Sequence, residues 1–247
     1  TASELTAALV TADTLVVAGT ATANITDEAT TDIDATVLSA IGAKTSGAIT
    51  VTNAIDIAGT ADEVTAALVT DDTLVVASTA TVTISDNPSI SALNAIAAKT
   101  DGVVTATLAA DSLSNLGALT TAGTDLITIT VNDNAEADVT ASDLSTLGGK
   151  TAGVVTVSNA VDISGTASEL TAALVTADTL VVASTATANI TDEATTDINA
   201  TVLSAIGAKT SGTITVTNAI DISGTAAEIT AALVTVSYTH LTLPTSR

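Results

Sequence analysis

Oxygen-bearing side chains between Asp125 and Asp138 are the best candidates for ligand binding in this sequence of 247 residues. Asp125 precedes the stretch Val131-Asn132-Asp133-Asn134-Ala135-Glu136-Ala137-Asp138, which we expect to form a loop. Calcium prefers carboxylate and amide oxygens, so this loop is a candidate calcium site. It matches neither an EF-hand loop nor the glycine-rich repeat of calcium-binding β-rolls. We therefore assign no metal ligand and keep calcium only as an alternative.

The sequence lacks the groups that nucleophilic or acid–base catalysis requires. A hydroxyl nucleophile needs a base beside it, but the single histidine, His240, lies near the carboxyl-terminal end and there is no cysteine. Adjacent carboxylates on a surface turn do not converge on one substrate; the pairs are Asp27-Glu28, Asp71-Asp72 and Asp192-Glu193. We expect no catalytic residue, no cofactor and no enzymatic activity.

Four lysines share the motif Lys-Thr-x-Gly, which predicts a structural role; they are Lys44, Lys99, Lys150 and Lys209. A cation in the last turn of a helix complements the helix dipole, and a following glycine adopts the tight conformation that ends the helix. We interpret the motif as a helix end. A phosphate-binding loop is rejected, because Gly149-Lys150-Thr151 has Leu144 where that loop needs a glycine.

The charge of the chain excludes several partners. It has 27 acidic and 5 basic residues, which gives a formal net charge of −22. Nucleic acids bind clustered Lys and Arg, so we expect no nucleic-acid partner.

No apolar run approaches the length of a membrane span, so we expect no membrane insertion.

Two repeat lengths organise the chain. Residues 1–70 recur as 166–235 with six conservative differences, which indicates a 165-residue super-repeat. Inside it, the threonine that ends each helical segment recurs at spacings of 21–34 residues, typical of solenoids and arrays. These threonines are Thr11, Thr45, Thr70, Thr100, Thr121, Thr151, Thr176, Thr210 and Thr235.

One short repeat, residues 47–70, shows how the elements follow from the sequence. Aliphatic and polar residues alternate over 49–57, which predicts strand with a break near Asn53. Thr60 followed three residues later by Glu63 forms a capping box, in which each side chain binds the other's backbone N–H. The next apolar stripe predicts a short helix and consists of Val64, Ala67 and Leu68. The same helix start recurs at residues 1, 140, 166 and 225.

These repeats predict an α/β repeat protein, an elongated solenoid of strand–strand–short-helix repeats over residues 1–235. The chain has no Phe, Trp or Met, so thin aliphatic layers must form the core. The alternative fold is a tandem array of β-sandwiches, which the abundance of Val and Thr favours. Helices this short are marginal alone, so neighbouring repeats of the same chain are the expected partners.

Residues 236–247 depart from the super-repeat. Where the repeat predicts Asp-Asp-Thr-Leu-Val, the chain has Val236-Ser237-Tyr238-Thr239-His240. Residues 236–245 resemble the translation of a transposase-type sequencing adapter. We therefore expect a non-native tail, and this tail contains the only His, Tyr and Arg of the chain.

In its motifs T-A-x-E-[LVI]-T-A-A-L and K-T-x-G-x-[IV]-T-V, residues 1–235 resemble the Thr/Ala/Val/Asp-rich repeats of very large secreted or cell-surface proteins of marine bacteria, particularly cyanobacteria. The resemblance implies an extracellular or cell-surface location and a structural or adhesive spacer, with cell-surface or matrix components as partners. Such repeats often accompany calcium-binding β-rolls, which leaves a calcium-dependent binding or adhesion module as the alternative function.

Overall fold

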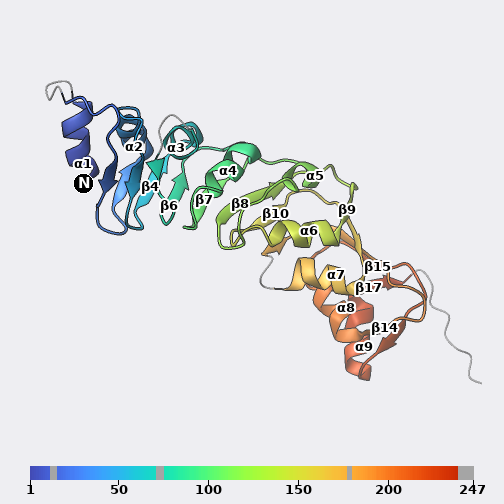
Figure 1. Ribbon diagram of the computed structural model, residues 1–247. Coiled ribbons are helices and arrows are strands. Elements are labelled where there is room, and N and C mark those ends of the chain that lie inside the picture. Colours follow the sequence, from blue (N-terminus) through green and yellow to red (C-terminus); the bar gives the residue numbers. More distant parts are fainter. Residues whose placement is uncertain (12–15, 71–74, 177–179, 239–247) are drawn as a thin grey trace, which may run out of the picture. The chain divides into compact units, whose positions relative to one another are not determined.

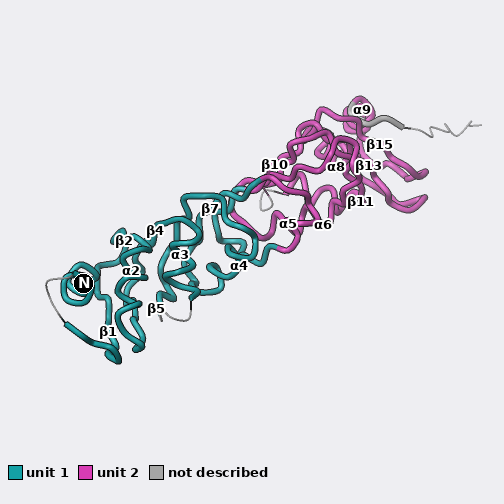
Figure 2. Tube along the Cα trace, turned by 90° about the horizontal axis from the view of Figure 1, so that it is seen from above, with its two compact units in different colours: residues 1–109, 119–128 teal, residues 110–118, 129–247 magenta. Residues whose placement is uncertain are grey.

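The computed structural model describes residues 1–11, 16–70, 75–176 and 180–238, and it divides into two compact units (Figures 1 and 2). Unit 1 comprises residues 1–109 and 119–128, and unit 2 comprises residues 110–118 and 129–247. Each unit is an α/β structure that repeats the order strand, strand, short helix, with parallel sheets. The coarse fold prediction is therefore confirmed.

Unit 1 contains two parallel sheets and a row of helices. The helical segments are α1 (Ala2–Leu5), the π-helical turn η1 (Thr6–Val10), α2 (Ala35–Gly42), α3 (Ala61–Leu68) and α4 (Ile90–Ala97). One sheet has the order β1 (Ala23–Ile25), β3 (Ile49–Val51), β5 (Val75–Val76). The other has the order β2 (Asp32–Asp34), β4 (Asp56–Gly59), β6 (Thr81–Ile84), β7 (Val104–Thr107) and the first half of β8 (Leu126–Val131).

Unit 2 is built in the same way. Its helical segments are α5 (Leu113–Leu116), α6 (Ala141–Gly148), α7 (Ala167–Leu170), the π-helical turn η2 (Thr171–Val175), α8 (Ala200–Gly207) and α9 (Ala226–Thr235). The second half of β8 pairs with β10 (Val155–Val157), and β10 pairs with β12 (Val181–Val182). A second sheet has the order β9 (Asp138–Thr140), β11 (Asp162–Gly165), β13 (Thr187–Ile190), β15 (Ile214–Val216), β17 (Val236–Tyr238), and β14 (Asp197–Asn199) pairs with β16 (Asp221–Ser223).

Strand pairing gives a more regular period than the threonine spacing does. Paired residues lie between 21 positions apart, as for Thr105 and Leu126, and 26 positions apart, as for Ala23 and Ile49. The helix-end spacings of 21–34 residues therefore do not measure the stacking period. One of the two longest intervals, from Thr176 to Thr210, contains an additional strand, β13, which pairs with β11 on one side and β15 on the other. The sheet thus continues in register while successive helices are further apart in sequence.

The core consists of small aliphatic layers, as the composition predicts. In the repeat of residues 47–70, the inward-facing strand residues and the apolar stripe of α3 are buried; they are Ile49, Val51, Ile55, Ile57, Val64, Ala67 and Leu68. All strand pairs among the described residues are parallel and the strands alternate with helices. The alternative of tandem β-sandwiches is therefore wrong, because sandwiches of that kind are antiparallel.

The first three residues of the carboxyl-terminal tail form strand β17 (Val236–Tyr238). Strand β17 pairs in parallel with β15, with Val236 opposite Ile214 and Tyr238 opposite Val216. Residues 239–247, His240 among them, lie outside the described residues.

Candidate functional site

The buried carboxylate of Asp125, the first residue of the candidate calcium site, binds two backbone N–H groups of unit 1. Its Oδ1 accepts a hydrogen bond from the N–H of Val104 at 2.8 Å, and its Oδ2 accepts one from the N–H of Ala122 at 2.9 Å. Asp125 is only 4% exposed. These bonds join its turn to the start of the adjacent strand β7, which is a structural use of the carboxylate.

Side chains of the predicted loop of residues 131–138, in unit 2, also form hydrogen bonds to other groups of the protein. Asp133 Oδ2 accepts a hydrogen bond from the N–H of Leu113 at 2.7 Å. Asn132 Oδ1 accepts bonds from the Ser158 hydroxyl and the Asn159 amide, both at 3.1 Å. Among the described residues, no group of three or more His, Cys, Asp or Glu side chains is placed to hold a metal ion.

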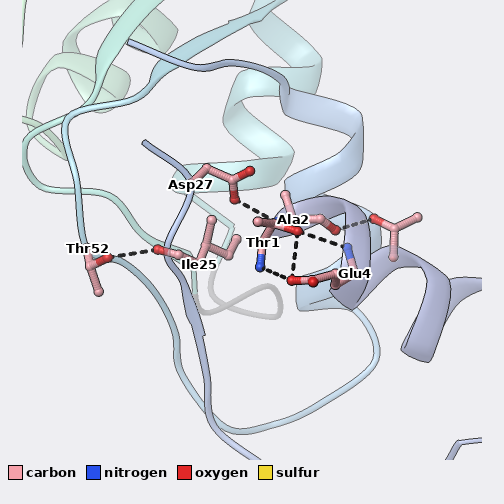
Figure 3. A network of polar contacts seen from close by, with 7 residues as sticks. Thr1, Ala2, Glu4, Ile25, Asp27 and Thr52 are labelled. Carbon is pink, nitrogen blue, oxygen red and sulfur yellow. Dashed lines mark hydrogen bonds and ion pairs between the residues drawn. The ribbon is translucent and has the colours of Figure 1, made fainter. Parts of the chain in front are cut away.

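Polar side chains gather at the start of helix α1 (Figure 3). At α1, Glu4 Oε2 accepts a hydrogen bond from the Thr1 amino group at 2.7 Å, and Thr1 Oγ1 accepts one from the N–H of Glu4 at 3.3 Å. Asp27, which belongs to the next repeat, completes the arrangement, because its Oδ2 accepts a bond from the N–H of Ala2 at 2.7 Å. Two of the unpaired N–H groups of the helix start, those of Ala2 and Glu4, are thereby satisfied.

The carboxylate from the next repeat recurs along the chain. Asp86 accepts from Ala61, Asp133 from Leu113 and Asp192 from Ala167, each at 2.7 Å. Sequence reasoning treated Asp27 and Asp192 as solvated turn residues and missed this bond between repeats. The signal was an Asp 25 residues after the first helical residue, shortened to 20 at Asp133. Asp71 and Asp72 lie outside the described residues.

A Thr-Asn or Ser-Asn pair after a strand binds the preceding repeat through two carbonyl groups. The hydroxyls of Thr52, Ser158 and Thr217 donate to the carbonyl oxygens of Ile25, Val131 and Ile190 at 3.0, 3.0 and 2.9 Å. The side-chain amides of Asn53, Asn159 and Asn218 donate to the carbonyl oxygens of Asp27, Asp133 and Asp192 at 2.6, 2.7 and 2.7 Å. Each pair therefore supports the turn that carries the capping aspartate.

The Lys-Thr-x-Gly motif is a contact between repeats, and its expected role needs correction. Lys44 lies beyond the end of α2 at Gly42, and the glycine of the motif, Gly47, has no positive φ. The Thr45 hydroxyl donates to the Ala21 carbonyl, 24 residues earlier, and accepts from the N–H of Gly47 at 3.0 Å. A Cβ at Gly47 would overlap that carbonyl group, so close approach explains the glycine. The same arrangement occurs twice more: Thr100 and Gly102 lie against the Ala80 carbonyl, and Thr210 and Gly212 lie against the Ala186 carbonyl.

The predicted capping boxes form wherever the third helical residue is Glu. Both bonds are present at Thr1, Thr60, Thr166 and Thr225, whereas at Thr140 the hydrogen bond of the Asp143 N–H to the threonine hydroxyl is the one formed. The hydrogen bonds from the terminal amino group and the hydroxyl of Thr1 lower the pKa of Glu4. The hydrogen bonds from the backbone N–H and the hydroxyl of Thr166 and Thr225 lower the pKa of Glu169 and Glu228. These carboxylates are therefore held ionised as caps.

Several helix starts have a hollow beside them on the described surface. One of about 500 Å³ is lined by Asp133, Asp138, Asp143 and Lys150. Two others, of about 600 and 530 Å³, occupy counterpart positions beside α1 with η1 and beside α7 with η2.

No protein-family model, no curated protein and no solved structure matches the chain. None of the helices that the structure describes is long and apolar enough to cross a membrane.

Proposed function

We propose that the chain is a non-enzymatic spacer segment of a large secreted or cell-surface repeat protein, with a structural or adhesive role. In this proposal the repeats stack into an elongated solenoid, and neighbouring repeats are the main partners of each repeat.

The observation that carries the proposal is the use of polar side chains between repeats. The carboxylates of Asp27, Asp86 and Asp192 bind helix N–H groups of the preceding repeat. The hydroxyls of Thr52 and Thr217 bind carbonyl groups of the preceding repeat. These hydrogen bonds connect neighbouring repeats through residues that recur along the chain. In a repeat array, each contact between neighbours adds to the stability of the whole.

The extracellular location rests on the sequence resemblance. A net charge of −22 supports it in one respect, because strong mutual repulsion keeps long extended molecules soluble and apart. The spacer is favoured over the calcium-dependent module because the carboxylates of Asp125 and Asp133 bind backbone N–H groups.

Small-angle X-ray scattering of proteins with one, two and three copies of residues 1–165 tests the spacer. The proposal predicts that the maximum dimension grows by equal steps while the radius of gyration of the cross-section stays constant. A cross-section that widens with copy number, or steps that shrink as in a flexible chain of beads, would contradict it.

A further inference from the structure

The hollows beside α1, α5 and α7 share one construction. In each, a helix-capping aspartate is followed five positions later by a second aspartate, which begins a short strand; the pairs are Asp27 and Asp32, Asp133 and Asp138, and Asp192 and Asp197. This strand comes between two successive helices of the chain. After Asp86 no such strand is present, and helix α4 begins only four positions later, at Ile90. The added strand therefore accounts for the hollow.

The hollow beside α7 lies within unit 2 and combines carboxylates with aliphatic side chains. Ile198 is 5% exposed and Val202 is half-buried, while Asp197 is exposed and Asp192 is half-buried. No Lys, Arg or His is among the described residues that line it, and the same holds for the hollow beside α1. Such a surface suits an alkyl chain that ends in a positive charge, because methylene groups cover aliphatic side chains while the charge faces carboxylates.

The hollow beside α5 has a group of this kind in place. Lys150 lines it together with Asp133, Asp138 and Asp143, and Lys150 is half-buried. Lysine carries an ammonium group on a flexible stem of methylene groups. The chain itself therefore shows which chemical group such a hollow accommodates.

One helix residue explains why Lys150 enters its hollow. Asp143 lies seven positions before Lys150, which is about two turns of a helix, so both residues reach the same side of α6. At α7 the counterpart of Asp143 is Val202, and the counterpart of Lys150 is Lys209, which is exposed and does not line the hollow. The hollow beside α1 has the same combination, Val37 and Lys44. These two hollows thus keep the carboxylates and the aliphatic surface without a lysine from the adjoining helix.

We propose that the hollows beside α1 and α7 bind lysine side chains of a partner protein, in the way that the hollow beside α5 takes Lys150. At α7 the ammonium group lies between the carboxylates of Asp192 and Asp197, and the carbon chain packs on Ile198 and Val202. One such contact is weak, but the site recurs with the 165-residue super-repeat, so several contacts with one lysine-rich partner reinforce one another. The spacer function requires no ligand, so this inference goes beyond it.

Titration of the full chain with Nα-acetyl-lysine methylamide, followed by amide chemical shifts, tests the proposal. We expect saturable shifts confined to the residues that line the hollows beside α1 and α7. The dissociation constant should be in the millimolar range, because a single exposed ion pair over a short alkyl chain stabilises weakly. The norleucine analogue, which has no ammonium group, should cause no such shifts, and the arginine analogue should bind no better than the lysine analogue.

Three substitutions separate the two hollows from each other and from general attraction to an acidic protein. Ser168→Leu places an aliphatic side chain in the hollow beside α7 without changing the charge, so the shifts there should be lost while those beside α1 remain. Asp197→Asn should weaken binding beside α7 by about two- to five-fold. Glu193→Gln is its matched control, because exposed Glu193 does not line the hollow. This control should change the affinity by less than about twofold.

Removal of the Lys150 side chain is the most demanding test. Lys150→Ala should create a third site, seen as new shifts around Asp133, Asp138 and Asp143 that the original chain does not show. Shifts spread evenly over the acidic surface, an equal response to the norleucine analogue, tighter binding of the arginine analogue, or no third site in Lys150→Ala would each overturn the proposal.

Discussion

The carboxylate of Asp86 lies 2.7 Å from the backbone nitrogen of Ala61, the first residue of helix α3 in the preceding repeat. Within its own repeat, the same helix start is capped by the Thr60 hydroxyl and the Glu63 carboxylate. Helix α3 therefore begins where two repeats meet, and Asp86 is both a helix cap and a contact between repeats. The same kind of bond is present at the starts of α1, α5 and α7.

Removing this carboxylate should weaken the junction. We expect Asp86→Ala to lower the free energy of unfolding by about 1 kcal/mol, the usual effect of losing a helix cap. Urea denaturation measures it, and hydrogen exchange at the Ala61 amide should accelerate. Asp101→Ala is the matched control, because exposed Asp101 carries the same charge and should change stability by less than about 0.5 kcal/mol. Equal losses in both variants would show that charge alone matters.

A methyl group at Gly102 should push two repeats apart. Its Cβ would overlap the carbonyl group of Ala80, so we expect Gly102→Ala to cost about 1–3 kcal/mol. Gly117→Ala is the control, since Gly117 has a φ of −57° and its Cβ would have ordinary contacts, none closer than 3.4 Å. That change should be neutral or stabilise by up to about 1 kcal/mol. Thermal denaturation of the two variants measures both changes in stability. If Gly102→Ala left the stability unchanged, the close approach of Gly102 to the Ala80 carbonyl would be contradicted.

The two super-repeat copies should differ in their response to acid at one helix start. Asp34 caps α2 through the N–H and the hydroxyl of Thr36, and these bonds lower its pKa. A depressed folded pKa adds stability above the ordinary value of the carboxyl group, and this stability is lost as the pH falls through the folded pKa. Asn199 caps α8 in the same way and does not titrate.

Asp34→Asn should therefore gain stability relative to the original chain as the pH falls from about 5 to below 4. The reverse substitution, Asn199→Asp, should add a loss of stability over the same range. Urea midpoints recorded across the pH series measure both changes. If the two substitutions leave the pH profile unaltered, the Asp34 cap does not contribute in the way that its geometry indicates.

Calcium should act on this protein only through its charge. Asp133 binds the Leu113 N–H, and the described carboxylates do not gather around one point. Millimolar calcium and magnesium should therefore raise the melting temperature equally, by screening the acidic surface. A saturable rise specific to calcium and abolished by Asp133→Asn/Asp138→Asn would instead establish the alternative function, because a ligand bound only by the native state stabilises it.

Sequence periodicity was sufficient to predict the elements and the core. Alternation over residues 49–57 and the stripe of Val64, Ala67 and Leu68 depend on local geometry alone, and all these apolar residues are buried as expected. The capping boxes were also predictable, because Thr and Glu three residues apart meet within one helical turn.

Contacts between repeats were harder to predict, because they depend on register. Asp27 binds Ala2 only because the chain returns to the same level after 25 residues, whereas the interval that contains Asp27, from Thr11 to Thr45, is 34 residues long. Gly47 was misread for the same reason, since the carbonyl that excludes a side chain belongs to another repeat. Thr30 and Thr195 have positive φ angles of 64° and 66°, which a β-branched residue gives no reason to expect.

The most direct test of hydrogen-bonded stacking is the stability of chains with different numbers of super-repeats. Urea denaturation should be recorded for one, two and three copies of residues 1–165 in a single polypeptide. If neighbouring repeats hold one another as the structure indicates, the midpoint rises and the transition steepens with each added copy, because every copy adds a junction. Superimposable curves for all three chains would show that the copies fold independently, and would contradict the account.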